Sequence, residues 1–151
     1  MRALYLCLAI TFALAAPLAA AERLVVRQSK FPVKETMDRL AAAIEARGLK
    51  VALRADHAAA ARAAGLDLPP TEVVMFGNPK LGTPLMQASP AIAIDLPMRM
   101  LAWQDSKGRT WIGYAAPKAL KARHGVKGQD ASFNAMATAL DGLAVAAATG
   151  N

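Results

Sequence analysis

The sequence predicts an α+β domain in two layers, with its long helices packed on one face of a mainly antiparallel sheet. One observation is the order of the predicted elements, which runs strand, helix, strand, short helix, strand, hairpin, helix and is typical of this class. Another is a pair of strand-like segments joined by a short turn, which predicts antiparallel pairing. The third is length: 151 residues without an internal repeat or a long linker form one domain.

Residues 1–21 are predicted to be a secretory signal peptide. Arg2 supplies a short positive segment, residues 3–16 are almost wholly apolar, and a run of three small residues ends at Ala21. Cleavage after Ala21 leaves residues 22–151 as a single domain in the periplasm or outside the cell. The alternative is an uncleaved membrane anchor, for which the apolar run is short. No later stretch is expected to be long and apolar enough to cross a bilayer.

A strand over 24–29, a helix over 33–47 and a strand over 49–55 open the predicted domain. The helix has apolar residues at the i, i+3, i+4, i+7 spacing of one face, and Gly48 is suited to end it. Alternating apolar and basic residues predict that the second strand is half-buried. The helical face consists of Met37, Leu40, Ala41 and Ile44, and the apolar side of the second strand consists of Leu49, Val51 and Leu53.

The middle of the chain is predicted to hold short elements. Asp56 is suited to cap an alanine-rich helix over 57–64. Thr83-Pro84 has the form of an N-cap followed by proline at the first helical position, which predicts one helical turn over 84–88. The other segments are a strand over 72–76, a turn over 77–79 and a stretch over 90–97 to which we assign no structure.

The last third is predicted to form a hairpin and two helices. Residues 98–104 and 109–114 pair around a turn at 105–108, with Gln104 opposite Arg109. In this register one face holds Arg99, Leu101, Trp103, Ile112 and Tyr114, and the other holds Met98, Met100, Ala102 and Trp111. A short helix over 120–124 and a long helix over 130–148 follow, and the apolar stripe of the long helix consists of Phe133, Met136, Leu140, Leu143 and Ala147.

Both faces of the predicted sheet are therefore largely apolar. Two helices can cover one face but hardly both, so the second face needs another cover. A partner subunit, a ligand or the segment 79–95 would serve, and a homodimer is the interpretation that we prefer.

The composition excludes several classes of protein. With 55% hydrophobic residues the chain is not disordered or collagen-like. Its single cysteine, Cys7, lies in the signal peptide, so neither an intrachain disulfide nor a zinc–thiolate site is expected. The net charge is +7, but the basic residues are scattered without interleaved aromatics, so no nucleic-acid interface is predicted. A weak affinity for acidic ligands or an anionic membrane surface is left open.

The order of several short motifs resembles the domain-of-unknown-function 302 family. The resemblance runs from about Phe31 to His124, and its most specific part is the succession of Phe-Gly-Asn-Pro-Lys at 76–80 and Asp-Leu-Pro at 95–97. The other motifs are Lys-Glu-Thr-Met-Asp-Arg-Leu at 34–40, Gly-Leu at 48–49, Ala-Asp-His at 55–57 and Gly-Thr-Pro-Leu-Met at 82–86, and Asp-Leu-Pro is the start of the motif Asp-Leu-Pro-Met-Arg at 95–99. The resemblance implies a small domain similar to the TATA-binding-protein-like β-α-β(4)-α arrangement, often dimeric, and it implies no activity. Many relatives lack a signal peptide, so this chain would be an exported member.

His57 and Asp95 are the acid–imidazole pair that these motifs single out. His57 stands at the start of a predicted helix, whose partial positive charge favours a neutral imidazole suited to a metal or to base catalysis. If the fold brings the pair together, they form a candidate metal site or acid–base pair. The simpler interpretations are a histidine packed at a helix start and an aspartate that fixes the turn at Leu96-Pro97.

The loop from Gly77 to Thr83 is a candidate anion site. It leads into a predicted helix N-terminus, where the backbone N–H groups near Asn78, together with the Lys80 side chain, could hold a carboxylate or phosphate. The Gly-Lys-Ser/Thr ending of a Walker loop is missing. The simpler interpretation is a structured turn after a strand.

Other chemistry finds less support in the sequence. Met86, Met98 and Met100 are suited to Cu(I), but methionine is far more often a packing residue. Neither Gly-x-Ser-x-Gly nor His-Glu-x-x-His is present. No cofactor is evident, although a metal ion at His57 and Asp95 is left open.

These observations favour a noncatalytic, exported, dimeric binding or accessory module over an enzyme. Its small-ligand, anion or metal site would lie at the strand ends, where His57, Gly77, Asn78, Lys80, Thr83 and Asp95 are the candidate ligands. One alternative is an enzyme that uses His57 and Asp95, and a second is a purely structural dimer.

Overall fold

The computed structural model describes residues 24–150. The predicted signal peptide lies outside the described residues. The elements in chain order are β1 (Leu24–Gln28), α1 (Val33–Glu45), β2 (Val51–Asp56), α2 (His57–Ala63), β3 (Thr71–Phe76), α3 (Pro79–Ala88), the 3₁₀ helix η1 (Pro90–Asp95), β4 (Met98–Gln104), β5 (Thr110–Ala115), α4 (Pro117–Arg123) and α5 (Asp130–Thr149).

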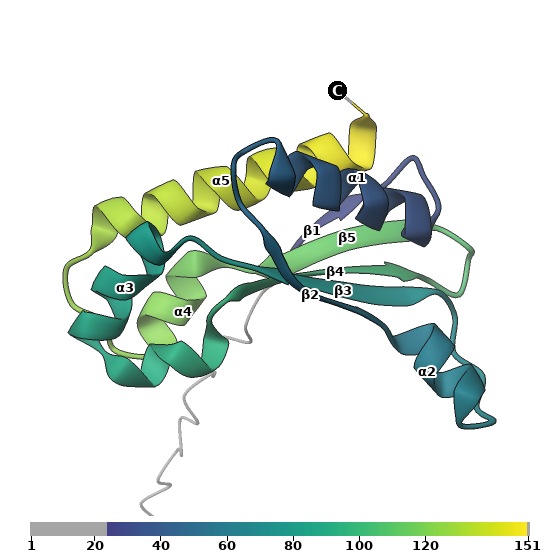
Figure 1. Ribbon diagram of the computed structural model, residues 1–151, viewed down its shortest axis with the longest axis horizontal. Coiled ribbons are helices and arrows are strands. Elements are labelled where there is room, and N and C mark those ends of the chain that lie inside the picture. The colour runs from purple at the N-terminus through teal and green to yellow at the C-terminus, as the bar shows by residue number, and fades with distance from the viewer. Residues whose placement is uncertain (1–23, 151) are drawn as a thin grey trace, which may run out of the picture.

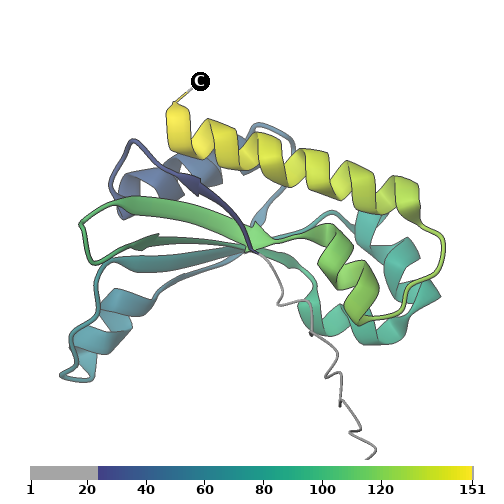
Figure 2. The same ribbon diagram turned by 180° about the vertical axis from the view of Figure 1, so that it is seen from behind.

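The five strands form one antiparallel sheet in the order β1-β5-β4-β3-β2. The long helices α1 and α5 lie together on one face of it, whereas α2 extends from one end and α3, η1 and α4 gather at the other (Figures 1 and 2). This is a β-α-β(4)-α arrangement with short helices inserted between the strands. The predicted α+β class and the two-layer packing are confirmed.

The core lies between the two long helices and the sheet. The helical stripes predicted from the apolar spacing contribute most of its helical side, since each buried face keeps the 3.6-residue period. The helices contribute Val33, Met37, Leu40, Ile44, Phe133, Met136, Leu140, Leu143 and Ala147, and the sheet contributes Val74, Phe76, Met98, Met100, Ala102, Ile112 and Tyr114.

The hairpin register differs by one residue from the prediction. Gln104 pairs with Thr110 and not with Arg109. The reason is Asp105, whose carboxylate accepts hydrogen bonds from the backbone N–H groups of Lys107 and Arg109, each at 2.9 Å, and so holds Arg109 in the turn. Gly108, at φ 74°, supplies the left-handed residue that this turn needs.

The shift changes which side chains share a face. Ile112 and Tyr114 join Met100 and Ala102 under the helices, whereas Trp111 lies beside Trp103 on the other side. The prediction that Ile112 and Tyr114 share a face with Leu101 and Trp103 was therefore wrong.

A bulge in β2 overturns another part of the predicted pattern. The register shifts between Val51 and Leu53, so Val51 pairs with Phe76 on the helix-covered face while Leu53 pairs with Met75 on the opposite one. Leu53 is therefore 50% exposed. The alternation of residues 49–53 does not hold across the bulge.

The helix α3 begins earlier than predicted. Asn78 is its N-cap, with the side chain accepting a 3.0 Å hydrogen bond from the Lys80 backbone N–H, and Pro79 stands at the first helical position. Pro84 lies inside the helix, so Thr83 is not its cap. The cap predicted at Asp56 is confirmed, since its carboxylate accepts from the Ala59 N–H at 2.8 Å.

We call the side of the sheet away from α1 and α5 the open face. The described residues leave much of it uncovered: Leu24, Val26 and Leu53 are 49%, 44% and 50% exposed. By register its residues are Leu24, Val26, Gln28, Leu53, Ala55, Thr71, Val73, Met75, Arg99, Leu101, Trp103, Trp111, Gly113 and Ala115.

Candidate functional site

The buried carboxylate of Asp95 is the centre of a charged cluster at one end of the sheet. Asp95 closes η1 and is 9% exposed. It accepts hydrogen bonds from the Arg99 Nη2 at 3.2 Å and from the Arg123 Nη1 at 2.8 Å. Its Oδ2 also lies 2.6 Å from the Nε2 of His124. One carboxylate thus connects η1, β4 and the end of α4.

The local sequence explains how these partners arrive. Arg99 is the second residue of β4, where alternation places it on the open face between two core methionines. Pro117 starts α4, and its last turn brings Arg123 and the C-cap residue His124 to Asp95. The carbonyl oxygen of His124 also accepts a 3.4 Å hydrogen bond from Ser89 Oγ, just before η1.

The cluster joins two guanidinium groups to the carboxylate of Asp95. Guanidinium groups are always charged. The side chains of Arg99 and Arg123 are 50% and 43% exposed, whereas His124 and Asp95 are each 9% exposed. Asp95 and His124 therefore act as a buried support, and the arginines present their charge to solvent.

A pocket of about 300 Å³ lies beside the cluster. Its polar rim comes from Arg99, Arg123 and Asp95, and its apolar floor comes from the sheet and α4. The floor consists of Leu24, Met98, Leu101, Gly113, Tyr114, Ala115 and Leu120. Burial raises the pKa of Tyr114, with the nearby charge of Asp141 adding to the effect, so its hydroxyl stays protonated. An apolar floor with a few convergent charged groups is typical of a small-ligand site.

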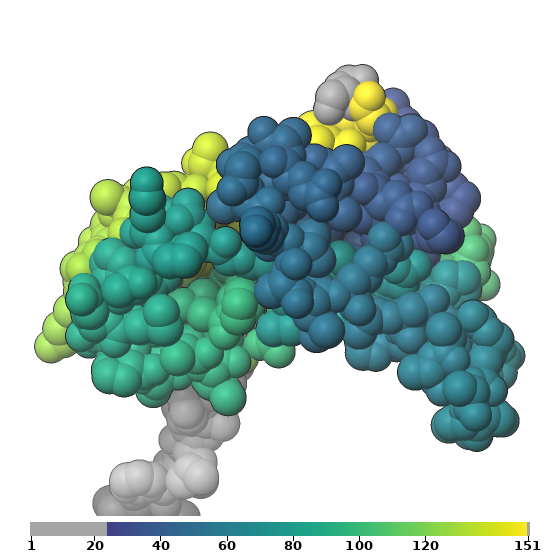
Figure 3. All heavy atoms as spheres, in the orientation of Figure 1, coloured from purple at the N-terminus to yellow at the C-terminus, as the bar shows by residue number. Residues whose placement is uncertain are grey.

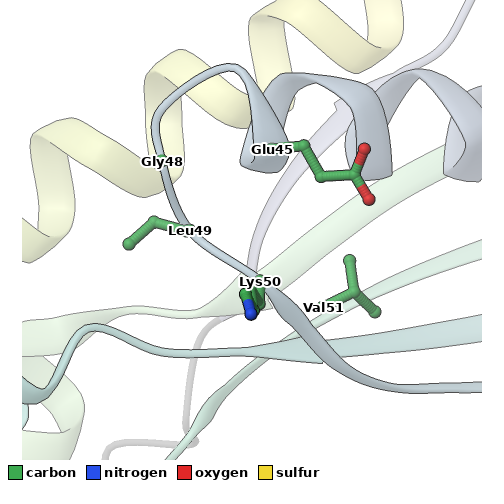
Figure 4. A pocket seen from close by; sticks show the side chains of 5 residues that line it. All are labelled: Glu45, Gly48, Leu49, Lys50 and Val51. Atoms are coloured by element: carbon green, nitrogen blue, oxygen red, sulfur yellow. The ribbon is translucent and has the colours of Figure 1, made fainter.

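A larger hollow of about 510 Å³ does not have this character. Its five lining residues all belong to the end of α1, the connection and the start of β2, and Glu45 and Leu49 point in different directions (Figure 4). Glu45 and Lys50 are its charged members, and both are exposed. We therefore place the candidate site at Asp95.

The structure does not bring His57 and Asp95 together. His57 is an exposed residue at the start of α2, the helix that projects from the body of the molecule in Figure 3. The strand pairing places Asp56, the neighbour of His57, in line with Ala102 near the end of β4, whereas Asp95 comes before Met98 at the start of β4. Along β4, Ala102 and Met98 are four residues apart, which corresponds to about 13 Å. The imidazole beside Asp95 is that of His124.

The loop from Gly77 to Thr83 does lie at the Asp95 end of the sheet. A Cβ at Gly77 would stand 3.2 Å from Cβ of Pro97, so the loop packs against the segment that follows Asp95. Asn78 is occupied as the cap of α3, and the side chains of Lys80 and Thr83 are exposed.

Arg99 and Arg123 were missed as site residues from the sequence. Arg99 could have been found, because it follows Asp95 by four residues within one motif. Among the described residues no group of three or more His, Cys, Asp or Glu side chains is placed to hold a metal ion. Met98 and Met100 are buried in the core, at 6% and 0% exposure, which favours the packing interpretation.

The fold and the site define a small α+β domain with an open sheet face and a charged pocket at its end. The chain belongs to the family described as Domain of unknown function DUF302, which it matches over residues 25–143. The crystal structure of an uncharacterized conserved DUF302 protein from Bacillus stearothermophilus has the same fold, with a TM-score of 0.65, 19% identity, and coverage of 83% of this chain and 94% of that one.

Two curated relatives carry the name Fluoride-specific ion channel FluC 1. The relative from Brucella suis biovar 1 (strain 1330) is 45% identical over 116 residues, which is 76% of this chain and 46% of the relative. The relative from Brucella abortus biovar 1 (strain 9-941) gives the same identity over 43% of its length. The chain thus spans less than half the length of these relatives.

One described helix, α5, is long and apolar enough by length and composition to cross a membrane. This corrects the expectation that no stretch after the signal peptide meets that criterion. In the structure α5 packs on α1 and the sheet, with Leu140, Leu143 and Ala147 buried.

Proposed function

We propose that this chain is an exported, noncatalytic binding or accessory domain that holds a small anion at Arg99 and Arg123. The observation that carries the proposal is the pair of half-exposed guanidinium groups, fixed by the buried Asp95 at the rim of the 300 Å³ pocket. Guanidinium groups positioned in this way favour carboxylates and phosphates, which accept paired hydrogen bonds.

An accessory role agrees with the named relatives, in which the matching part is less than half of the chain. Among the described residues only α5 has the length and apolar composition of a span, and its buried side chains serve the core. We therefore assign no ion conduction to this domain. After reconstitution of the purified protein in liposomes, we expect no fluoride flux above that of empty vesicles.

The anion site is tested by thermal shift and calorimetry with fluoride, acetate and phosphate as probes. We expect at least one of them to raise the melting temperature and Arg99→Met to abolish the shift. Lys107→Met is the matched control, because it removes an exposed cation in the hairpin turn, away from the pocket. The proposal fails if no anion binds, or if Arg99→Met binds as the parent protein does.

A homodimer through the open face is a second candidate, favoured by the exposure of Leu24, Val26 and Leu53. Light scattering after size exclusion would then give twice the monomer mass. Val26→Lys is expected to yield a monomer, whereas Ala42→Lys, on the outer side of α1, leaves the dimer intact. A parent protein that is monomeric at high concentration would exclude this candidate.

A further inference from the structure

Several residues that line the pocket at Asp95 also belong to the apolar open face. Leu101 and Gly113 are cross-strand partners in the pocket floor, and Trp103 and Trp111 are the next open-face pair along the same strands. A Cβ at Gly113 would stand 3.3 Å from Cζ3 of Trp103, so the indole ring lies over this glycine. The charged rim thus stands at one end of an apolar strip that ends in tryptophan rings.

The charge on the strands of the open face is positive and comes from a single residue. Arg99 is its one charged residue, because the other open-face positions on the five described strands are apolar or uncharged polar residues. A second copy docked face to face would therefore bring no carboxylate on its own strands to Arg99. An anionic group linked to an apolar chain would suit both the half-exposed Arg99 guanidinium and the strip.

We propose that the ligand is a free amphipathic carboxylate, an acid with an apolar chain of about eight to ten carbons, which suits the ~13 Å that four strand residues span between Arg99 and Trp103. Its carboxylate accepts hydrogen bonds from Arg99, and its chain lies along Leu101 towards the indole ring of Trp103. This inference rests on the proposed anion site and adds the apolar part of the ligand. It uses two features that a small inorganic anion leaves unexplained, the apolar pocket floor and the exposed strip beyond it.

The test is a calorimetric series with acetate, hexanoate, octanoate and decanoate, each below its micelle concentration, and with 1-octanol as the uncharged analogue. Each buried methylene is expected to tighten binding by up to about fourfold. Octanol is expected to bind at least about tenfold more weakly than octanoate, because it lacks the charge-assisted hydrogen bonds. Both tryptophans of the chain lie on the open face, so their fluorescence provides a second readout.

Two variants distinguish the contribution of the carboxylate to binding from the contribution of the apolar chain. Arg99→Met is expected to weaken all the acids by a similar factor, and Arg99→Gln serves if that variant melts early. Leu101→Ser is expected to reduce the gain in affinity per methylene, measured relative to acetate binding by the same variant. Lys107→Met is the control for both and should bind as the parent does.

The outcomes distinguish this inference from the proposed anion site. Anion binding that depends on Arg99 but not on chain length would overturn the inference and leave the anion site standing. No binding of any acid would overturn the inference, and the anion site would fall with it only if fluoride and phosphate also fail to bind. Binding to vesicles with anionic lipids but not to free acids would overturn the inference, and so would a stable dimer that excludes decanoate.

Discussion

Replacement of Asp95 by asparagine tests whether the charged cluster holds the end of the molecule together. The asparagine side chain would keep the shape of the aspartate but lose the charge that three partners share. The contact with His124 is buried on both sides, at 9% exposure each, whereas the arginines are half-exposed. The histidine contact therefore counts as a buried hydrogen bond to a charged group, and the arginine contacts count as surface ion pairs.

Because one buried hydrogen bond to a charged group and two surface ion pairs are lost, we expect Asp95→Asn to lower the free energy of unfolding by about 2–3 kcal/mol. For a domain of this size that is a fall of about 8–12 °C in melting temperature. The assay is thermal unfolding followed by circular dichroism at neutral pH. Asp67→Asn is the control, since Asp67 is exposed in the loop after α2, and its effect should stay within about 0.5 kcal/mol.

A double-mutant cycle assigns the loss to the contact with His124. His124→Ala in the Asp95→Asn background should cost clearly less than it does alone, with a coupling of about 1 kcal/mol or more. If Asp95→Asn melts within about 2 °C of the parent, or if the two effects simply add, then Asp95 does not join η1 to α4 as argued.

The other predictions concern the core, the hairpin turn and the N-terminus. Leu140→Ala should cost about 2–5 kcal/mol because the side chain is buried, whereas Leu53→Ala should cost under about 1 kcal/mol in the monomer; equal losses in denaturant titrations would contradict the packing described. The Trp111 indole and backbone N–H groups hold the pKa of Asp105 well below its usual range, so Asp105→Asn should lower the melting temperature at pH 7, and the difference should shrink as pH falls below about 4; a gap that is constant with pH would refute this. Intact mass spectrometry of the exported protein should give a chain that begins at Glu22, and an unprocessed mass would support the membrane-anchor alternative.

The helices and most strands were predictable because their signals are local. The buried stripes of α1 and α5 follow the 3.6-residue period, and the Asp56 cap depends on residues next to it. The start of α3 was also encoded locally, since Asn78-Pro79 has the same cap-and-proline form as Thr83-Pro84. Choosing between the two needed the knowledge that a proline inside this helix is tolerated.

The errors in the sheet arose from single side chains that no periodicity reports. The Asp105 carboxylate pulls Arg109 into the turn and moves the hairpin register by one, which exchanges the faces of one strand. The bulge before Leu53 likewise inserts a residue and turns an apparent core leucine outward. In both places the apolar pattern alone fits either register.

Asp95 was identifiable from the sequence, but its partners were not, for a reason that lies in the packing. Arg123 and His124 follow it by 28 and 29 residues, and they reach it only because α4 folds back beside η1. His57 was the predicted imidazole partner of Asp95, but the strand register places it at the far end of β4.

The alternation of β4 links the surplus apolar face to the charged site. Met98 and Met100 point into the core, so Arg99 between them must point to the open face, directly beside the carboxylate four residues before it. The same alternation puts Leu101 and Trp103 in line behind Arg99. A single strand therefore produces a cation followed by an apolar row, which is why an acid with an apolar chain suits this surface better than an inorganic anion or an uncharged partner.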